Sequence, residues 1–456
     1  MAKIFDEHRR DEIIRGNFKE VMKEMYIPTI LGSIVGVLYT LADTYWLGGL
    51  GYVALSAPVM SWIVQSTLFS IVIMCPLAVY SIIPRLIGQE RVSSARSFAG
   101  TTITFTGLLL LVAVLSYNYL IVPNVHYLFK SSPEVIEAFK AYTLITAFST
   151  AILYLSSTIS SIISAWGYPD VRAYVSIPFT ILNIILDPLL LYGIGPFPAL
   201  GVEGVAYATL ISEALEFITY IILISARTPV HISHHDLIPI KEELREILKV
   251  GLPHSANFVL TYLALFIVLT IGTYISDFVV AAFGMVYYIS GIFSTPILSL
   301  ITIGTIVGGE YIGVGDYNYA KKVFQYTLKV VFVSSFIVFT IVTLLSPYIG
   351  AFFVRGGENI EATIKEFVVG MITFGYTNIP YLMGMVFLAP FRASGKTYYE
   401  TIFSIIRFWV LRVPCVVLLA IVLGLGSIGF WLGLLISNVG ALPIGYVFYT
   451  KELWKV

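Results

Sequence analysis

The chain has 456 residues, of which 58% are hydrophobic and only 12% are charged. Soluble domains carry about 25% charged residues because their surface faces water, so this composition excludes a soluble protein and indicates that lipid is the main solvent. The 27 basic and 27 acidic residues cancel to a net charge of zero, which removes the electrostatic argument for nucleic-acid binding, and no nucleic-acid partner is expected.

Twelve apolar segments are each long enough to cross a bilayer, which takes about 20 residues per helix. In chain order they are 26–48, 55–84, 98–123, 136–164, 171–194, 204–226, 250–275, 279–308, 323–353, 366–391, 397–424 and 427–450. None alternates with the period of two that a membrane β-barrel strand would have. The predicted fold is therefore an all-α polytopic membrane protein.

Basic residues predict the orientation of these spans. Twenty-one Lys and Arg residues fall on the side of the N-terminus, and only Lys130, Lys140, Arg355 and Lys365 fall on the other. Loops rich in Lys and Arg stay in the cytoplasm. We therefore expect a multi-pass protein of the cell membrane with both termini cytoplasmic.

The two halves of the chain resemble each other at an offset of 225 residues. The matched pairs are Pro28 and Pro253, Gly88 and Gly313, Ala95 and Ala320, Gly201 and Gly426, Gly204 and Gly429, and Leu210-Ile211-Ser212 with Leu435-Ile436-Ser437. Since six helices precede the second copy, both copies have the same orientation and form a parallel repeat, one of the ways transporters build a central cavity.

The repeat predicts the domain organisation. It comprises a cytoplasmic N-terminal segment (1–24), a first lobe of six helices (25–226), a cytoplasmic linker with an interfacial helix (227–249), a second lobe of six helices (250–450) and a cytoplasmic tail (451–456). The interfacial helix is expected from an apolar stripe at helical spacing, formed by Ile240, Leu244, Ile247 and Leu248.

Two acids lie at membrane depth in the first lobe, where a charge costs at least about 2.5 kcal/mol. Asp43 in the first helix and Asp187 in the fifth are each about 25 Å from the cytoplasmic side at 1.5 Å per residue. Two carboxylates at one depth are able to share a proton or to coordinate a cation. A helix-end position for Asp43 and a capped helix break at Asp187-Pro188 are the structural alternatives.

Polar neighbours accompany both acids. Tyr39 and Asn183 each precede an acid by one helical turn on the same face, and Tyr142 and Thr209 reach a comparable depth. Ordinary packing is the alternative for Tyr39, Tyr142 and Thr209. The second lobe has Val268 in place of Asp43 and Arg412 or Cys415 in place of Asp187, and this asymmetry favours a functional role for the acids.

Other polar residues give weaker indications. Glu213 and Glu216 in the sixth helix, with Arg407 and Arg412 in the eleventh, are candidate cavity charges that either meet substrate or pair with neighbouring helices. The histidines at 231, 234 and 235 have the spacing of metal ligands, but a solvated loop is the preferred interpretation, and no metal site is expected. No phosphate-binding loop or catalytic constellation occurs, so an ion gradient must drive any transport, and an enzyme is not expected.

The run from Tyr39 to Asp43, the run Asn183-Ile-Ile-Leu-Asp187-Pro188 and the glycine-rich run Gly201 to Thr209 together resemble the MATE multidrug exporters. The resemblance covers the whole chain, is strongest to the archaeal DinF-like branch, and implies the two-lobed fold of the MOP superfamily. It implies antiport of H⁺ or Na⁺, with no other cofactor, against organic, often cationic and amphipathic compounds, by a monomer in the lipid bilayer.

The resemblance also implies site residues. Asp43, Asp187 and Asn183 match the cation-coupling group, with Tyr39, Tyr142 and Thr209 around them. Ser160 and Gly36 stand in this pocket where relatives have Asn and Gln, which leaves open which cation is used. Pro28 leaves a carbonyl without its helical donor and is the predicted hinge.

Two other functions compete with this prediction. A lipid or lipid-linked oligosaccharide flippase of the same superfamily would need several cavity cations for a pyrophosphate, and only Arg407 and Arg412 lie deep. A non-transporting membrane scaffold predicts no ion-dependent flux and dispensable acids.

Overall fold

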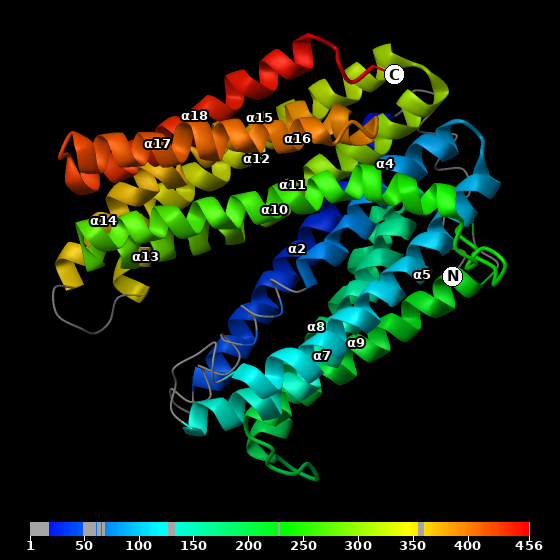
Figure 1. Cartoon of the computed structure of the whole chain (residues 1–456), viewed down its shortest axis with the longest axis horizontal. Helices are drawn as coiled ribbons and strands as arrows, with labels where there is room; N and C mark the ends of the chain where they lie inside the picture. Colours follow the sequence, from blue (N-terminus) through cyan, green and yellow to red (C-terminus); the bar gives the residue numbers. More distant parts are fainter. Residues whose placement is uncertain are drawn as a thin grey trace. The chain divides into compact units, whose positions relative to one another are not determined.

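The computed structural model describes residues 18–48, 61, 65, 69–125, 133–226, 229–353 and 360–455, with the backbone alone for 37–48 and a few other helical positions. Within these ranges the chain is helical and contains no strand (Figure 1). Eleven of the described helical segments are long and apolar enough to cross a membrane. The predicted all-α membrane fold is confirmed.

The elements of the first half are α2 (Phe18–Gly48), η1 (Ser70–Ile73), α4 (Met74–Gly88), α5 (Val92–Ser116), η2 (Tyr117–Ile121), η3 (Val122–Asn124), α7 (Pro133–Ala165), α8 (Pro169–Tyr192) and α9 (Val202–Ser225). Those of the second half are α10 (Lys241–Ile275), α11 (Asp277–Val314), α12 (Tyr317–Leu344), α13 (Ser346–Phe353), α14 (Ile360–Gly370), η4 (Met371–Gly375), α15 (Asn378–Ala393), α16 (Tyr398–Ser404), η5 (Ile405–Arg412), α17 (Val413–Val416), η6 (Val417–Val422) and α18 (Gly426–Thr450). η1 and η3 are 3-10 helical, whereas η2, η4, η5 and η6 are π-helical.

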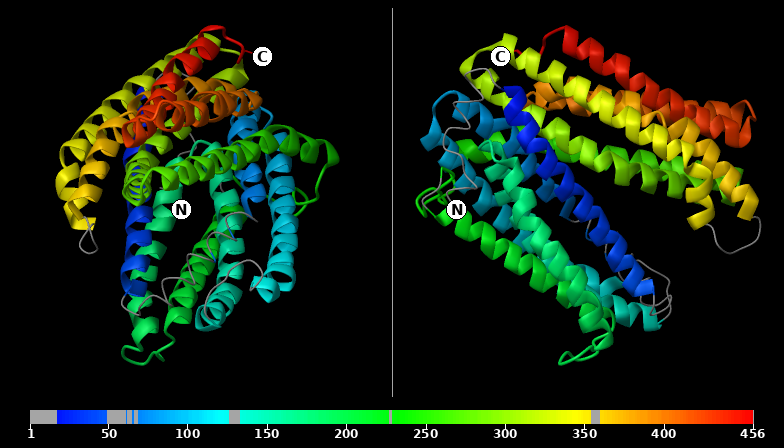
Figure 2. Two further views of the ribbon diagram at one scale, coloured as in Figure 1. Left: turned by 60° about the vertical axis from the view of Figure 1, so that its left-hand side comes forward. Right: turned by 180° about the vertical axis from the view of Figure 1, so that it is seen from behind.

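Contacts divide the described residues into two compact units. Lys23–Leu252 belong to the first, and Phe18–Met22 together with Pro253 onward belong to the second. The first unit runs from blue to green in Figure 2 and the second from green to red. Each unit has its own apolar core, around Val79 and Ile163 in the first and around Phe283 and Trp431 in the second.

Several predicted spans are interrupted. The segment predicted as one helix over 323–353 is two helices, because Pro347 lacks the N–H that would continue α12, and the Ser346 hydroxyl donates to the Thr343 carbonyl instead (2.7 Å). The tenth span breaks at η4, where the Asn378 amide donates to the carbonyls of Phe374 and Gly375 at 3.2 and 2.9 Å. These side chains satisfy backbone groups that lipid would leave unpaired.

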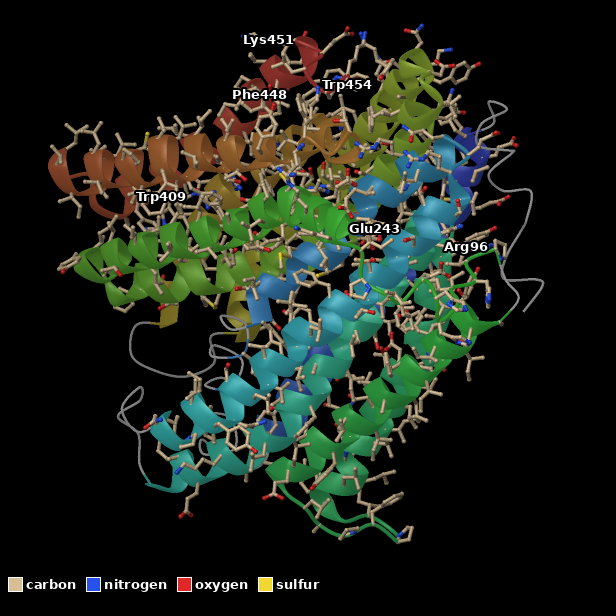
Figure 3. All side chains as sticks on the ribbon, turned by 45° about the vertical axis from the view of Figure 1, so that its right-hand side comes forward. Arg96, Glu243, Trp409, Phe448, Lys451 and Trp454 are labelled. Atoms are coloured by element: carbon tan, nitrogen blue, oxygen red, sulfur yellow. The ribbon has the colours of Figure 1, made fainter. Side chains whose placement is uncertain are left out.

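The linker has no separate interfacial helix in the part of the chain that the structure describes. Lys241 to Ile275 form the single helix α10, so the predicted stripe is the first turns of a membrane span. Glu243 accepts a hydrogen bond from Thr101 of α5 at 2.6 Å (Figure 3), and Ile247 is buried in the first unit's core. Leu244 also packs against this core, whereas Ile240 and Leu248 of the stripe are each 41% exposed.

Glycine lets α9 approach α8 closely. A Cβ on Gly204 would lie 2.5 Å from the carbonyl oxygen of Leu190, and Gly201, with φ of +58°, turns the chain into α9. At the offset of 225, a Cβ on Gly429 would lie 2.5 Å from the Leu419 carbonyl, and Gly426 has φ of +56°. The same close contact therefore occurs in both units.

We predict that Gly204→Ala destabilises the protein by about 1–3 kcal/mol, because the new methyl group meets backbone that has no room to move. The measurement is thermal unfolding in detergent. Gly107→Ala is the matched control, since nothing lies within 4 Å of a Cβ there. Equal melting temperatures for the two variants would contradict the close-packing argument.

Candidate functional site

Asn183 and Asp187 of α8 lie buried in the first unit, with 1% and 0% of their surface exposed. The Asn183 amide donates to the hydroxyl of Thr209 on α9 at 3.4 Å, and that hydroxyl donates to the Val205 carbonyl at 3.1 Å. The Oδ1 atom of Asn183 has no hydrogen-bond partner among the described residues. A carboxylate, an amide oxygen and a hydroxyl are hard oxygen donors of the kind that bind Na⁺ or exchange a proton.

Close helix packing holds this group together. The Gly204–Leu190 approach aligns α9 with α8, so that Thr209 meets Asn183. On the other side, a Cβ on Gly32 of α2 would lie 2.9 Å from the Cβ of Ala173, so α2 also runs against α8. α2 is the helix that carries the other predicted acid.

The side chains of Tyr39 and Asp43 lie outside the described residues, although the backbone of α2 passes through both. Gly36 is exposed on α2, with open space where a Cβ would be. α2 continues through Pro28, and the Thr29 hydroxyl donates to the Met25 carbonyl at 2.7 Å.

Tyr142 and Glu213 are half-buried in the first unit, on α7 and α9 respectively. Glu213 follows Thr209 by one turn, which puts both on one face of α9. α7 packs along α9 and also contacts α8. Tyr142 therefore lies on a helix that borders the acid–amide pair.

The structure does not bring Ser160 to Asn183 and Thr209. Its hydroxyl lies with that of Tyr220, beside Glu216 and Arg172. Tyr220 is eleven residues beyond Thr209 on α9, about 16 Å along the helix axis. Ser160 thus belongs to a second polar group, in which Arg172 also contacts Tyr80 of α4. Ser160 was assigned to the pocket by the family resemblance, which does not specify how α7 is aligned against α9.

A pair of arginines is buried in the second unit. Arg407 and Arg412 expose 6% and 1% of their surface, and both donate to the same oxygen, Oδ1 of Asn438, at 2.7 Å each. Arg412 also donates to Ser437 at 2.8 Å. The Asn438 amide in turn donates to Thr377 at 3.2 Å. The contacts that the structure describes for both arginines are to residues of the second unit.

Aromatic rings cover both guanidinium groups. Arg407 lies 3.7 Å from the ring centre of Tyr381, and Arg412 lies 5.3 Å from that of Phe374; Phe408 is 4.6 Å from each. Cation–π contacts of this kind contribute about 0.5–2 kcal/mol each.

The sequence analysis named both arginines but did not predict that they share one partner, because a regular α-helix would separate them. At 100° per residue, residues five apart point about 140° away from each other. Arg407 and Arg412 lie in η5, whose π-helical i→i+5 bonding puts residues five apart on one face. No pattern in the chain marks the π-helix in advance.

Histidines 231, 234 and 235 form no metal centre with other ligands in the described ranges, which contain no cluster of three His, Cys, Asp or Glu side chains. The His231 ring contacts the Ala226 carbonyl at 3.1 Å, and the rings of His234 and His235 lie 6.2 Å apart.

Comparison with known proteins identifies relatives along the whole chain. The MatE family model matches residues 28–189 and 253–418. The probable multidrug resistance protein YoeA of Bacillus subtilis is 25% identical over 93% of this chain and 90% of its own. A FAD transporter of Shewanella oneidensis is 22% identical over 94% of each chain. A solved outward-facing multidrug resistance MATE family transporter of the MOP superfamily is 24% identical, with a TM-score of 0.87 over 98% of both chains.

We predict that Asn438→Asp raises the stability of the protein by about 1–3 kcal/mol, because a carboxylate would neutralise the two guanidinium groups that share this position. Asn378→Asp is the matched control and should lower stability, since the Asn378 amide donates to two backbone carbonyls that a carboxylate would repel. Both are measured by thermal unfolding in detergent. A lower melting temperature for Asn438→Asp than for the wild type would show that the arginines are already neutralised.

Proposed function

The chain belongs to the MatE family of multidrug efflux transporters, and on this premise we propose that it exports small organic compounds by cation-coupled antiport with alternating access. The observation that carries the proposal is the buried group of Asp187, Asn183 and Thr209 in the first unit. A carboxyl group in lipid is stable when it is protonated or bound to a cation. Its loading state is therefore able to drive a structural change.

We assign the coupling site to Asp43, Asp187 and Asn183, with Tyr39, Tyr142 and Thr209 lining the pocket. Gly36 of α2 is exposed, with nothing within 4 Å of a Cβ built there, and we propose that this position faces the pocket. The coupling ion is H⁺ or Na⁺, since a carboxylate with neutral oxygen donors accepts either. The bound ion is the only cofactor in this scheme.

The internal repeat supports a rocking mechanism. The two matches to the family begin at Pro28 and Pro253, 225 residues apart, and the tight glycine contacts at Gly204 and Gly429 occur at the same offset. Two lobes of one orientation give a transporter whose halves tilt about a central path. We further propose that the monomer is the working unit, that both termini are cytoplasmic, and that no nucleic acid binds.

The organic cargo is expected to be amphipathic and often cationic, as the family resemblance implies, and one relative is named a probable multidrug resistance protein. A relative named as a FAD transporter carries an anion.

Replacing either acid should uncouple transport. We predict that Asp43→Asn and Asp187→Asn each lower drug efflux by about tenfold or more, because an amide cannot exchange the driving ion. Resistance of drug-sensitive cells is measured at equal expression, followed by flux from proteoliposomes under imposed pH or Na⁺ gradients. Glu242→Gln, which removes an exposed acid at the start of α10, is the control. Full resistance in Asp43→Asn or Asp187→Asn cells would rule out the coupling role of that acid.

Straightening the first helix should slow transport without harming the fold. Pro28→Ala restores an N–H in the interior of α2, and a proline there costs a helix about 3 kcal/mol. We expect an equal or higher melting temperature together with slower drug flux. Pro84→Ala in α4 is the matched control, because it removes another helix-interior proline of the same unit. Drug flux at the wild-type rate in the Pro28→Ala protein would contradict the role of Pro28 as a hinge.

A further inference from the structure

The arginine pair of the second unit carries two positive charges without a carboxylate. Among the described residues, the titratable groups that face Arg407 and Arg412 are the phenols of Tyr287 and Tyr381. The hydrogen-bond acceptors are equally neutral: the Asn438 amide, the Ser437 hydroxyl and the Tyr381 hydroxyl. Two like charges in a water-poor interior are stable only with a counter-charge.

The same unit contains an arginine with an ordinary counter-ion. Arg392 donates from both Nη2 and Nε to Oε1 of Glu400, at 2.8 and 2.9 Å, and both residues are largely buried. Glu366, another acid of this unit, accepts the indole N–H of Trp431 at 2.8 Å. Neither acid is among the groups that face the pair.

The guanidinium groups of Arg407 and Arg412 have N–H donors that are available to a further acceptor. Nε of Arg407 has no hydrogen-bond partner in the described part of the chain, and the two guanidinium groups together offer ten N–H donors to a few neutral oxygens. Forked donors of this kind match the paired oxygens of a carboxylate or phosphate. The π-helical turn of η5 presents both forks on one side.

An aromatic surface adjoins the charges. Phe374, which covers Arg412, is stacked on Tyr287 with ring centres 6.5 Å apart and contacts Phe283 at 6.2 Å. Tyr287 is 41% exposed, so this cluster reaches from the buried pair to the surface of the unit. A flat apolar body attached to an anionic group fits such a surface.

We propose that Arg407 and Arg412 form a binding site for the carboxylate or phosphate group of an amphipathic anion, with Asn438 holding the two guanidinium groups in register. The site binds the carboxylate or phosphate group of an exported compound, or the phosphate of a lipid headgroup. It extends the proposed function to anionic cargo, and it is independent of the acids in the first unit. At the repeat offset, Asn438 occupies the position of Glu213, so the two units differ in charge at this point.

The test measures equilibrium binding to the full chain in detergent, without any ion gradient. The probes are 1-naphthyl phosphate, neutral 1-naphthol and cationic 1-naphthylmethylamine, titrated by calorimetry. The wild type should bind the phosphate about tenfold or more tightly than the other two probes, since charge-assisted bonds to two guanidinium groups form only with the anion. Equal binding of the three probes would overturn the proposal.

Three variants locate the site. Arg407→Gln removes one guanidinium group, whereas Asn438→Asp keeps both arginines but supplies an internal carboxylate. Both variant proteins should lose the preference for 1-naphthyl phosphate. Lys329→Gln, which removes an exposed charge of α12 in the same unit, should keep it. Melting temperatures recorded without probe separate lost binding from lost folding. Retained preference in a folded Asn438→Asp protein would also overturn the proposal.

A final titration identifies the source of the anion. Phosphatidylglycerol and phosphatidylcholine are added to the protein loaded with 1-naphthyl phosphate. Displacement by phosphatidylglycerol alone assigns the site to a lipid headgroup, and retention of the probe assigns it to a soluble organic anion. Because binding needs no transport, a failure of drug efflux in the Asp43→Asn protein leaves this result unaffected, and the reverse also holds.

Discussion

A buried polar group in a membrane-spanning helix must find its partner within the protein, because lipid offers no hydrogen bonds. Hydroxyl groups such as Thr102 and Thr106 therefore donate to carbonyls one turn back, at 2.7 and 2.8 Å. The same constraint explains why broken helices are repaired by side chains, as Asn378 does at η4. Positions at which a charge has only neutral partners, such as Arg407 and Arg412, are consequently the exceptions that point to function.

The constraint also explains which features of the fold were predictable. A span of about 20 apolar residues has few alternatives to a membrane helix, so hydropathy located the helices. It did not reveal the break at Pro347, because the residues on both sides are equally apolar, nor the continuity of α10, because an apolar stripe looks the same against lipid and against protein. Hydrophobic periodicity did not predict the π-helical segments, because nothing in the sequence of η5 distinguishes it from an α-helix.

The candidate site was predictable to a similar extent. Asn183 and Thr209 meet as expected because depth and helix face are both encoded in sequence spacing, and the two helices are adjacent in the chain. Ser160 lies elsewhere because its neighbours depend on the register of α7 against α9, which a single sequence does not specify. The pairing of Arg407 with Arg412 depended on the π-helix, so the residues were noticed but their shared partner was not.

The two units use related helical frameworks for opposite charges. The tight glycine contact recurs at Gly204 and Gly429, and the helices that follow carry Thr209 to Asn183 in the first unit and Asn438 to two arginines in the second. The proposed cation site and the proposed anion site therefore lie in separate polar cores, because the two ligands require opposite charges.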